Sequence, residues 1–372
     1  AEFIFLPDPS GMGLLLNPAD LDHAIPRMSA FHPLAVGRTD WIENKNGCSA
    51  TDPIDAASLA YIPRPKSCRE GKPMRKFGLA LCAAAFLPSN LVIAQNISPR
   101  EVDALPATEP NVISNYGTDP LQFGELRLPA GEGPFPVVVI IHGGCWTDGY
   151  ATKQNTAPIA SDLRSAGFAT WNIEYRQVGS AGAGWPGTFL DWGNATDHLR
   201  TLAKDNGLDL SNVTVVGHSA GAHAALFVAS RSRLPVESEV RGEDPLPVKA
   251  VVAIDGPGDL GPFVGLDATI CGKPVIEPLI GGSIDTYPSR FSEASPAARL
   301  PLGVRQGLIS SSLVLSPEVA ETYRATATEA GDKVDVRVFG DSGHFEPIAP
   351  GSSEWRVVKE LILTFGGIEK QR

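Results

Sequence analysis

The segment VTVVGHSAGAHAALFVAS, residues 213–230, constrains the fold more than any other part of the chain. A β-branched run at 213–216 meets the pentapeptide GHSAG at 217–221, and an alanine-rich helical run follows. This order predicts a nucleophile elbow, in which Ser219 sits on a strained turn with its hydroxyl exposed above a sheet. The flanking glycines allow strand and helix to approach where a Cβ would clash. Glycine is common in this chain (38 of 372 residues), so the prediction depends on context as well as on the pentapeptide.

A second segment, FPVVVIIHGGCW at residues 135–146, supplies that context. The continuous apolar run 135–141 predicts a parallel strand buried on both faces. An acyl-transfer enzyme needs backbone N–H groups aimed at the developing oxyanion. We expect the N–H groups of Gly143, Gly144 and Ala220 to fill this role, with that of Cys145 as a further candidate.

The two motifs together resemble the α/β-hydrolase superfamily, and more narrowly its esterase, carboxylesterase and kynurenine-formamidase-like branch, over about residues 120–367. The resemblance implies an α/β-hydrolase fold: a mostly parallel central sheet flanked by helices, with a small cap or loop insertion. Segments with strand and helix patterns alternate along the chain, as such a sheet requires. Strands are expected at 121–128, 135–141, 169–175, 213–216, 248–254, 304–310 and 334–339, and helices at 157–166, 191–204, 317–330 and 355–365. The Gly- and Pro-rich excursion 256–302 is the expected substrate-covering cap.

A serine nucleophile needs a base, and in this superfamily the chain order is serine, acid, histidine. His344, in GDSGHFE directly after the last expected strand, is the predicted base. His218 and His223 flank the serine and are interpreted as packing residues. His142 is expected to order the oxyanion loop.

The acid departs from the pattern of the superfamily. Its usual place is the loop after the strand at 304–310, but the text there is LISSSLVLSPEVAE, with no carboxylate before Glu318. We predict Asp255, at the end of the strand expected beside the nucleophile strand, with Glu318 as the runner-up. The alternatives are a turn or N-cap aspartate at 255, helix-dipole compensation by Glu318, or a lost acid.

Residues 1–73 are rich in proline and short polar residues and show no sustained helical or strand period. Met74-Arg75-Lys76 and the apolar run after it predict a secretory signal peptide at 74–94, with cleavage after Ala94 and a periplasmic or secreted product. The run is too short and interrupted to span a bilayer stably. We expect residues 1–73 to be a misassigned or disordered extension, 95–119 a linker, and 120–372 the hydrolase domain.

Composition excludes several classes of function. The net charge of −11, without a block of basic residues, argues against nucleic-acid binding. The five cysteines and seven histidines show no metal-ligand spacing, so no metal is expected. Cys145 and Cys271 could form one disulfide, but two buried free thiols are the favoured interpretation.

One further segment matches a dinucleotide-binding motif in its letters but not in its context. The segment GAGWPG at 182–187 fits G-x-G-x-x-G, but Trp-Pro stands where a pyrophosphate would need bare backbone, so no dinucleotide cofactor is expected. The segment 185–192 is interpreted as a wall of the substrate pocket or as a structural loop.

These observations favour an exported serine hydrolase that cleaves a small or medium acyl ester through an acyl-enzyme, without a cofactor. Ser219 would attack the carbonyl carbon, and His344 would take the proton and return it to the leaving group. A small-molecule ester or amide is the expected partner. The alternatives are amide or formamide hydrolysis (arylformamidase-like) and a non-catalytic binding protein that has lost its acid.

Overall fold

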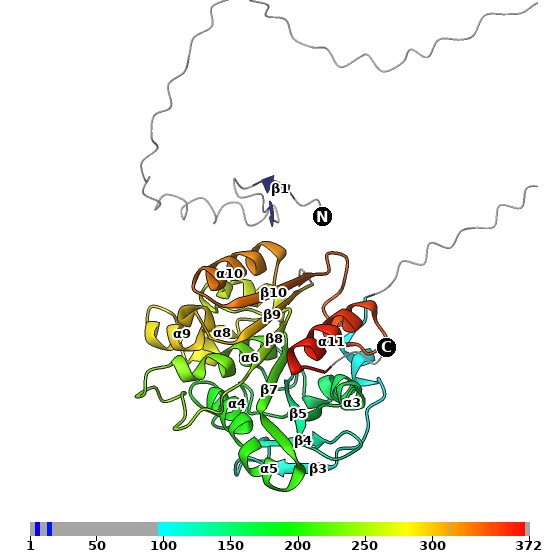
Figure 1. Ribbon diagram of the computed structural model, residues 1–372. Helices are drawn as coiled ribbons and strands as arrows, with labels where there is room; N and C mark the ends of the chain where they lie inside the picture. The colour runs from blue at the N-terminus through cyan, green and yellow to red at the C-terminus, as the bar shows by residue number, and fades with distance from the viewer. Residues whose placement is uncertain (1–3, 8–12, 17–95, 312, 369–372) are drawn as a thin grey trace, which may run out of the picture. The chain divides into compact units, whose positions relative to one another are not determined.

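The structure, a computed structural model, describes residues 4–7, 13–16, 96–311 and 313–368 (Figure 1). The predicted signal peptide at 74–94 lies outside the described residues. Two short apolar strands, β1 (Ile4–Pro7) and β2 (Gly13–Leu16), pair antiparallel as a separate two-stranded sheet. They lie in the segment where no strand period was expected, because four-residue runs are too short to establish one.

The other strands form one eight-stranded sheet in the order β10-β9-β8-β7-β5-β6-β4-β3. Their bounds are β3 Val112–Asn115, β4 Phe123–Arg127, β5 Phe135–Ile141, β6 Ala169–Ile173, β7 Leu208–His218, β8 Ala250–Ile254, β9 Arg305–Ser310 and β10 Lys333–Val338. The strands from β10 to β6 are parallel, whereas β4 pairs antiparallel with β6 and with β3. The sheet is therefore mostly parallel, as predicted.

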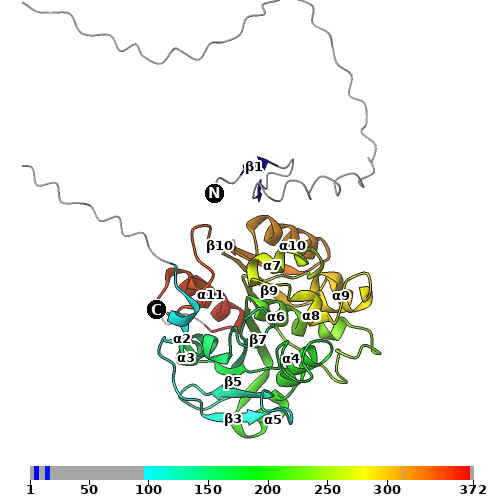
Figure 2. The ribbon, with the colours of Figure 1, turned by 180° about the vertical axis from the view of Figure 1, so that it is seen from behind.

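Helices cover both faces of this sheet (Figures 1 and 2). Successive side chains of β5 point to opposite faces: Val138 and Ile140 belong to one buried cluster, Val137 and Val139 to the other. The first cluster includes α2 (Pro99–Asp103), α3 (Ala157–Ser165) and α11 (Ser353–Gly366). The second includes α4 (Gly187–Asp197), α5 (Leu199–Asn206), α6 (Ala220–Ser230) and α10 (Pro317–Glu329). The apolar side chains of β5 therefore pack into the cores on both faces of the sheet.

The excursion between β8 and β9 carries three short helices, α7 (Leu266–Cys271), α8 (Ile276–Ile280) and α9 (Pro288–Ala294). Buried side chains such as Leu279 and Phe291 belong to the same core cluster as α6. The excursion therefore packs into the body of the domain. Single 3₁₀ turns complete the fold at η3 Lys153–Thr156, η4 Arg231–Arg233, η5 Gly261–Phe263, η6 Pro296–Arg299 and η7 Glu346–Ile348.

Two segments differ from the sequence-based expectation. The helix expected at 191–204 is two helices, α4 and α5, which meet at His198, and α4 begins earlier, at Gly187. The expected linker at 95–119 contains α2 and β3, which belong to the hydrolase domain because Val102 is fully buried and β3 extends the sheet. The sequence did not indicate either element, because each is only four or five residues long.

Candidate active site

Ser219 lies between the last residue of β7 and the first residue of α6, in a positive-φ conformation (φ 56°, ψ −122°). The tightness of this turn explains its glycines. A Cβ on Gly217 would lie 1.8 Å from the carbonyl oxygen of Gly221, and one on Gly221 would lie 2.1 Å from that of Ile141. The Ser219 N–H donates to the Ile254 carbonyl over 2.8 Å. These contacts hold the serine at the carboxyl edge of the sheet.

His344 lies in the loop after β10, and its Nδ1 is 2.6 Å from Oδ2 of Asp255. Asp255 directly follows β8, the strand that pairs with the nucleophile strand β7. The two side chains meet because parallel strands bring their carboxyl ends to one edge of the sheet. Since a carboxylate can only accept, His344 donates from Nδ1 and its Nε2 keeps a free lone pair.

The carboxylate of Asp255 is fully buried and heavily bonded. The Ser311 hydroxyl donates to Oδ2, and the Leu315 N–H donates to Oδ1 over 2.9 Å. Burial alone would raise the pKa of Asp255, but the His344 ring and the Ser311 hydroxyl outweigh burial, so its pKa lies below the usual value. The carboxylate is therefore ionised at neutral pH.

The runner-up acid, Glu318, lies elsewhere. It is in the first turn of α10, fully exposed to solvent, and the hydrogen bonds of that turn lower its pKa. Among the described residues it makes no bond to His344. The structure brings Asp255 to the histidine and leaves Glu318 at a helix end.

The loop of His344, the predicted base, lies against the residue that precedes Ser219, the predicted nucleophile. The His344 ring packs against the ring of His218, the residue before the serine, with centroids 4.4 Å apart. Within the described residues no hydrogen bond joins the Ser219 hydroxyl to His344. Such bonds are often long in a free enzyme and shorten when a substrate binds.

The oxyanion loop follows β5 and lies against the serine. A Cβ on Gly143 would be 2.9 Å from Cβ of Ser219, so only glycine permits this approach. The N–H groups of Gly143, Gly144 and Ala220 donate to no other described residue. They are therefore available to a ligand, and that of Ala220 also lies at the N-terminus of α6, where the helix dipole favours negative charge.

Glu174 and Tyr175, which the sequence did not assign to the site, brace this loop through His142, which was expected to order it. His142 is fully buried, and its Nε2 is 2.8 Å from Oε1 of Glu174, just after β6. The Tyr175 hydroxyl donates to the His142 carbonyl over 3.0 Å, and the two rings stack at 4.4 Å. Burial would raise the pKa of Glu174, but His142 and two backbone N–H groups lower it overall. The sequence signal that could have indicated this role is the position of Glu174 and Tyr175 at the end of the strand beside β5.

Backbone strain is concentrated at this edge. Among the described residues, the only non-glycine residues with positive φ are Cys145 (51°), Trp146 (53°), Ser219 (56°) and Asp255 (47°). Such conformations cost about 1–3 kcal/mol each and persist where the surrounding structure enforces them. They fall on the oxyanion loop, the nucleophile and the candidate acid.

Comparison with known proteins relates this chain to esterases. The BD-FAE family model matches residues 125–300, a range that includes Ser219 and Asp255 but ends before His344. Esterase LipC of Mycobacterium tuberculosis (strain ATCC 25618 / H37Rv) is 28% identical over 188 residues, 50% of this chain and 46% of that protein. Esterase LipQ of the same strain is 30% identical over 100 residues, 27% of this chain and 23% of that protein. The chain thus spans about half the length of the first of these relatives and less of the second.

Solved structures extend the likeness over most of the domain. A truncated form of a carbohydrate esterase from gut microbiota has a TM-score of 0.58 at 21% identity, covering 68% of this chain and 95% of that one. Esterase B from Lactobacillus Rhamnosis (HN001) has a TM-score of 0.58 at 18% identity, covering 73% and 90%. The chain has the α/β-hydrolase fold. Thermogutta terrifontis esterase 2, solved as its sarin-phosphonylated form, is a further structural neighbour (TM-score 0.56, 16% identity, covering 72% and 99%).

The structure contains a disulfide that the sequence interpretation did not favour. Cys145, in the oxyanion loop, is bonded to Cys271, the last residue of α7, across a separation of 126 residues. The Tyr150 hydroxyl also donates to the Cys271 carbonyl over 2.6 Å. The interpretation as two free thiols is therefore wrong. The partners are distant in sequence, and only the folded excursion brings them together.

Reduction of this disulfide is expected to lower the thermal midpoint on the order of 10 °C. Closing a loop of 126 residues stabilises a fold by about 4–5 kcal/mol in the chain-entropy account. Calorimetry with and without a phosphine reductant measures the shift. The double variant Cys145→Ala/Cys271→Ala should melt at the lower temperature and not respond to the reductant. An unchanged midpoint on reduction of the native protein would contradict the disulfide.

The segment at 185–192, interpreted as a pocket wall or a structural loop, packs mainly inward in this fold. Phe189 and Trp192 are fully buried and meet the His223 ring of α6 at 6.2 and 5.7 Å. Trp185 remains partly exposed. Only the start of the segment could therefore contact a ligand.

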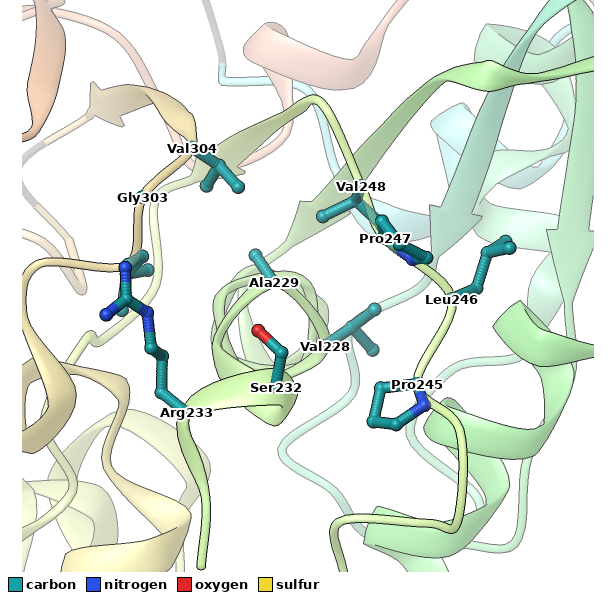
Figure 3. A pocket seen from close by; sticks show the side chains of 11 residues that line it. Val228, Ala229, Ser232, Arg233, Pro245, Leu246, Pro247, Val248, Gly303 and Val304 are labelled. Atoms are coloured by element: carbon teal, nitrogen blue, oxygen red, sulfur yellow. The ribbon is translucent and has the colours of Figure 1, made fainter.

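A cleft of about 300 Å³ lies at the opposite edge of the α/β-hydrolase sheet (Figure 3). It is lined by the C-terminal end of α6 and by the residues before β8 and β9, including Val248 and Val304. Ser219 and Asp255 follow the carboxyl ends of strands, so the cleft is separate from the candidate active site.

In the part of the chain that the structure describes, no group of three or more His, Cys, Asp or Glu side chains could hold a metal ion. No helix there is long and apolar enough to cross a membrane.

Proposed function

We propose that this α/β-hydrolase is a serine carboxylesterase for small or medium acyl groups. The observation that carries the proposal is the bond between His344 Nδ1 and the buried Asp255 carboxylate, beside the strained turn of Ser219. This bond leaves Nε2 of the histidine with a lone pair that can act as the base for Ser219. It also weighs against a binding protein without an acid, because His344 has a carboxylate partner.

In the proposed reaction Ser219 Oγ attacks the acyl carbon while His344 Nε2 takes its proton. The oxyanion accepts hydrogen bonds from Ala220 N–H and from Gly143 or Gly144 N–H. The tetrahedral intermediate then releases the alcohol, which takes the proton from His344, and the acyl group stays on the serine. Water enters by the same route, with His344 again as base, and releases the acid. Asp255 stays ionised and holds the imidazolium in place.

The names of the relatives support ester hydrolysis in particular. Both mycobacterial relatives are named esterases, and the three solved structures reported above are named as esterases too. Amide or formamide cleavage uses the same residues and is one outcome of the test below.

The test combines labelling with turnover. A fluorophosphonate probe should label the protein once, at Ser219, and tandem mass spectrometry locates the adduct. Nitrophenyl esters of graded acyl length, with matched anilides and formanilides, then show which bond is cleaved. Faster cleavage of the formanilides would replace the esterase with a formamidase. No labelling together with no turnover would contradict a serine hydrolase.

We further propose that the protein is exported and that residues 74–94 are removed as a signal peptide. The Cys145–Cys271 disulfide supports this proposal, because disulfides persist in oxidising compartments such as the periplasm. The exported native protein is expected to have the intact mass of Gln95 to Arg372 with one disulfide. Intact-mass spectrometry of the periplasmic and secreted fractions measures it. Recovery of peptides from residues 1–73 in those fractions would contradict the proposal.

A further inference from the structure

His218 occupies the variable position before the nucleophile and is the last residue of β7. Its side chain is buried, with 1% of its surface exposed. Its Nε2 is 2.9 Å from the carbonyl oxygen of His344, and its ring lies 4.4 Å from the His344 ring and 5.3 Å from that of Phe345. One side chain therefore holds both the main chain and the ring of the proposed base.

These contacts determine the tautomer and the protonation state of His218. A carbonyl oxygen only accepts, so Nε2 must carry the hydrogen. Burial lowers the pKa of His218 to about 3, with a smaller contribution from the neighbouring His344. The ring is therefore neutral, and its buried Nδ1, which has no hydrogen-bond partner in the described part of the chain, carries only a lone pair. A neutral donor can hold the His344 loop without repelling the positive charge that His344 gains in the reaction.

The other side of His218 faces the oxyanion loop. A Cβ on Gly143 would lie 2.8 Å from the His218 carbonyl oxygen and 3.4 Å from its Nδ1. His218 thus lies between the oxyanion loop and the loop of the base, next to the serine. Neither loop is part of a strand or helix at this point.

We propose that His218 is a positioning residue for His344, which it holds over Ser219 by donating Nε2–H to the His344 carbonyl and packing against the His344 ring. The inference rests on the proposed serine esterase function. It goes beyond that function because it assigns the base loop a second anchor besides Asp255. Without the anchor, His344 would still reach Asp255 but would sample positions away from the serine.

The test uses two variants whose side chains both end in an amide and differ only in length. In His218→Gln the side-chain N–H₂ can occupy the place of Nε2, whereas in His218→Asn it is too short to meet the His344 carbonyl. We expect His218→Gln to keep kcat within a few-fold of the native value. We expect His218→Asn to lose about 10- to 100-fold in kcat with KM nearly unchanged, because small misplacements of a catalytic group cost about that much. Equal kcat in the two variants would overturn the assignment.

His223, in the helix α6 that follows the elbow, provides a matched control. It is also fully buried, its Nε2 bonds a main-chain carbonyl (Ala294, 2.8 Å), and its Nδ1 has no partner within the described residues. The carbonyl that His223 bonds belongs to the last residue of α9 and not to the loop of His344. His223→Asn is expected to lower the thermal midpoint about as much as His218→Asn while keeping kcat within a few-fold. An equal loss of kcat in His223→Asn would reduce His218 to a packing residue.

A spectroscopic measurement separates this inference from the proposed function. The proton between His344 Nδ1 and Asp255 should give a far-downfield proton NMR signal, which does not depend on turnover. We expect the signal to persist in His218→Gln and to shift or broaden in His218→Asn. An unchanged signal in His218→Asn would overturn the inference. A native protein that shows this signal but neither labels nor turns over esters would instead overturn the function.

Discussion

Ester turnover is expected to fall by about 10⁶-fold in Ser219→Ala and by a similar factor in His344→Ala. Ser219 is the proposed nucleophile, and His344, which Asp255 orients, is its proposed base. Because the two act as a unit, the double variant should be barely slower than either single one. Initial rates on the best nitrophenyl ester, with thermal midpoints to show that the fold is intact, measure the effect.

Ser219→Ala should also lose all fluorophosphonate labelling, whereas His344→Ala should label slowly, because its serine remains but lacks its base. Glu318→Gln is a suitable fold control, since that side chain is fully exposed on α10. Turnover in Ser219→Ala within 100-fold of the native rate would require another nucleophile and would sink the proposed mechanism.

Asp255→Asn is the second large effect, with an expected loss in kcat of about 10⁴-fold, while Glu318→Gln should leave kcat unchanged. An asparagine at 255 can present its N–H₂ to the imidazole, which then holds the wrong tautomer and receives no charge stabilisation. The Leu315 N–H would still donate to the amide oxygen, and the Ser311 hydroxyl could turn to accept from the N–H₂, so the variant should fold. Steady-state kinetics of both variants across acyl lengths measure the contrast.

The reverse pattern, a loss in Glu318→Gln with a normal Asp255→Asn, would move the acid to α10. No loss in either variant would mean that His344 works without a carboxylate. In that case the rate of the native enzyme should already be low.

The parts of the site that the sequence reveals are those built from local geometry. The elbow at Ser219 needs glycines at 217 and 221 because backbone atoms lie within 2.1 Å of where their Cβ atoms would be. A run such as 135–141 must be buried on both faces to be stable. Asp255 could be proposed from topology alone, since neighbouring parallel strands end at one edge.

The remaining parts depend on contacts between distant segments. The loop after β9, which lacks the usual carboxylate, supplies Ser311 and Leu315 as donors to the relocated Asp255, and nothing in its composition indicates this role. The same holds for the bond of Glu174 to His142. Pairing of Cys145 with Cys271 depends on how the excursion folds back, which sequence spacing does not fix.

The disulfide also divides the three proposed catalytic residues into two groups. The covalent ring it closes, from Cys145 to Cys271, includes Ser219 and Asp255, whereas His344 lies 73 positions beyond it in the printed sequence. His344 follows β10, an edge strand of the sheet, which among the described strands pairs only with β9. Outer strands open more easily than central ones. Detachment of β10 would therefore remove His344 from the site and stop the proposed turnover. The cross-linked part of the chain would keep Ser219 and Asp255 in place, so turnover would resume when β10 pairs with β9 again.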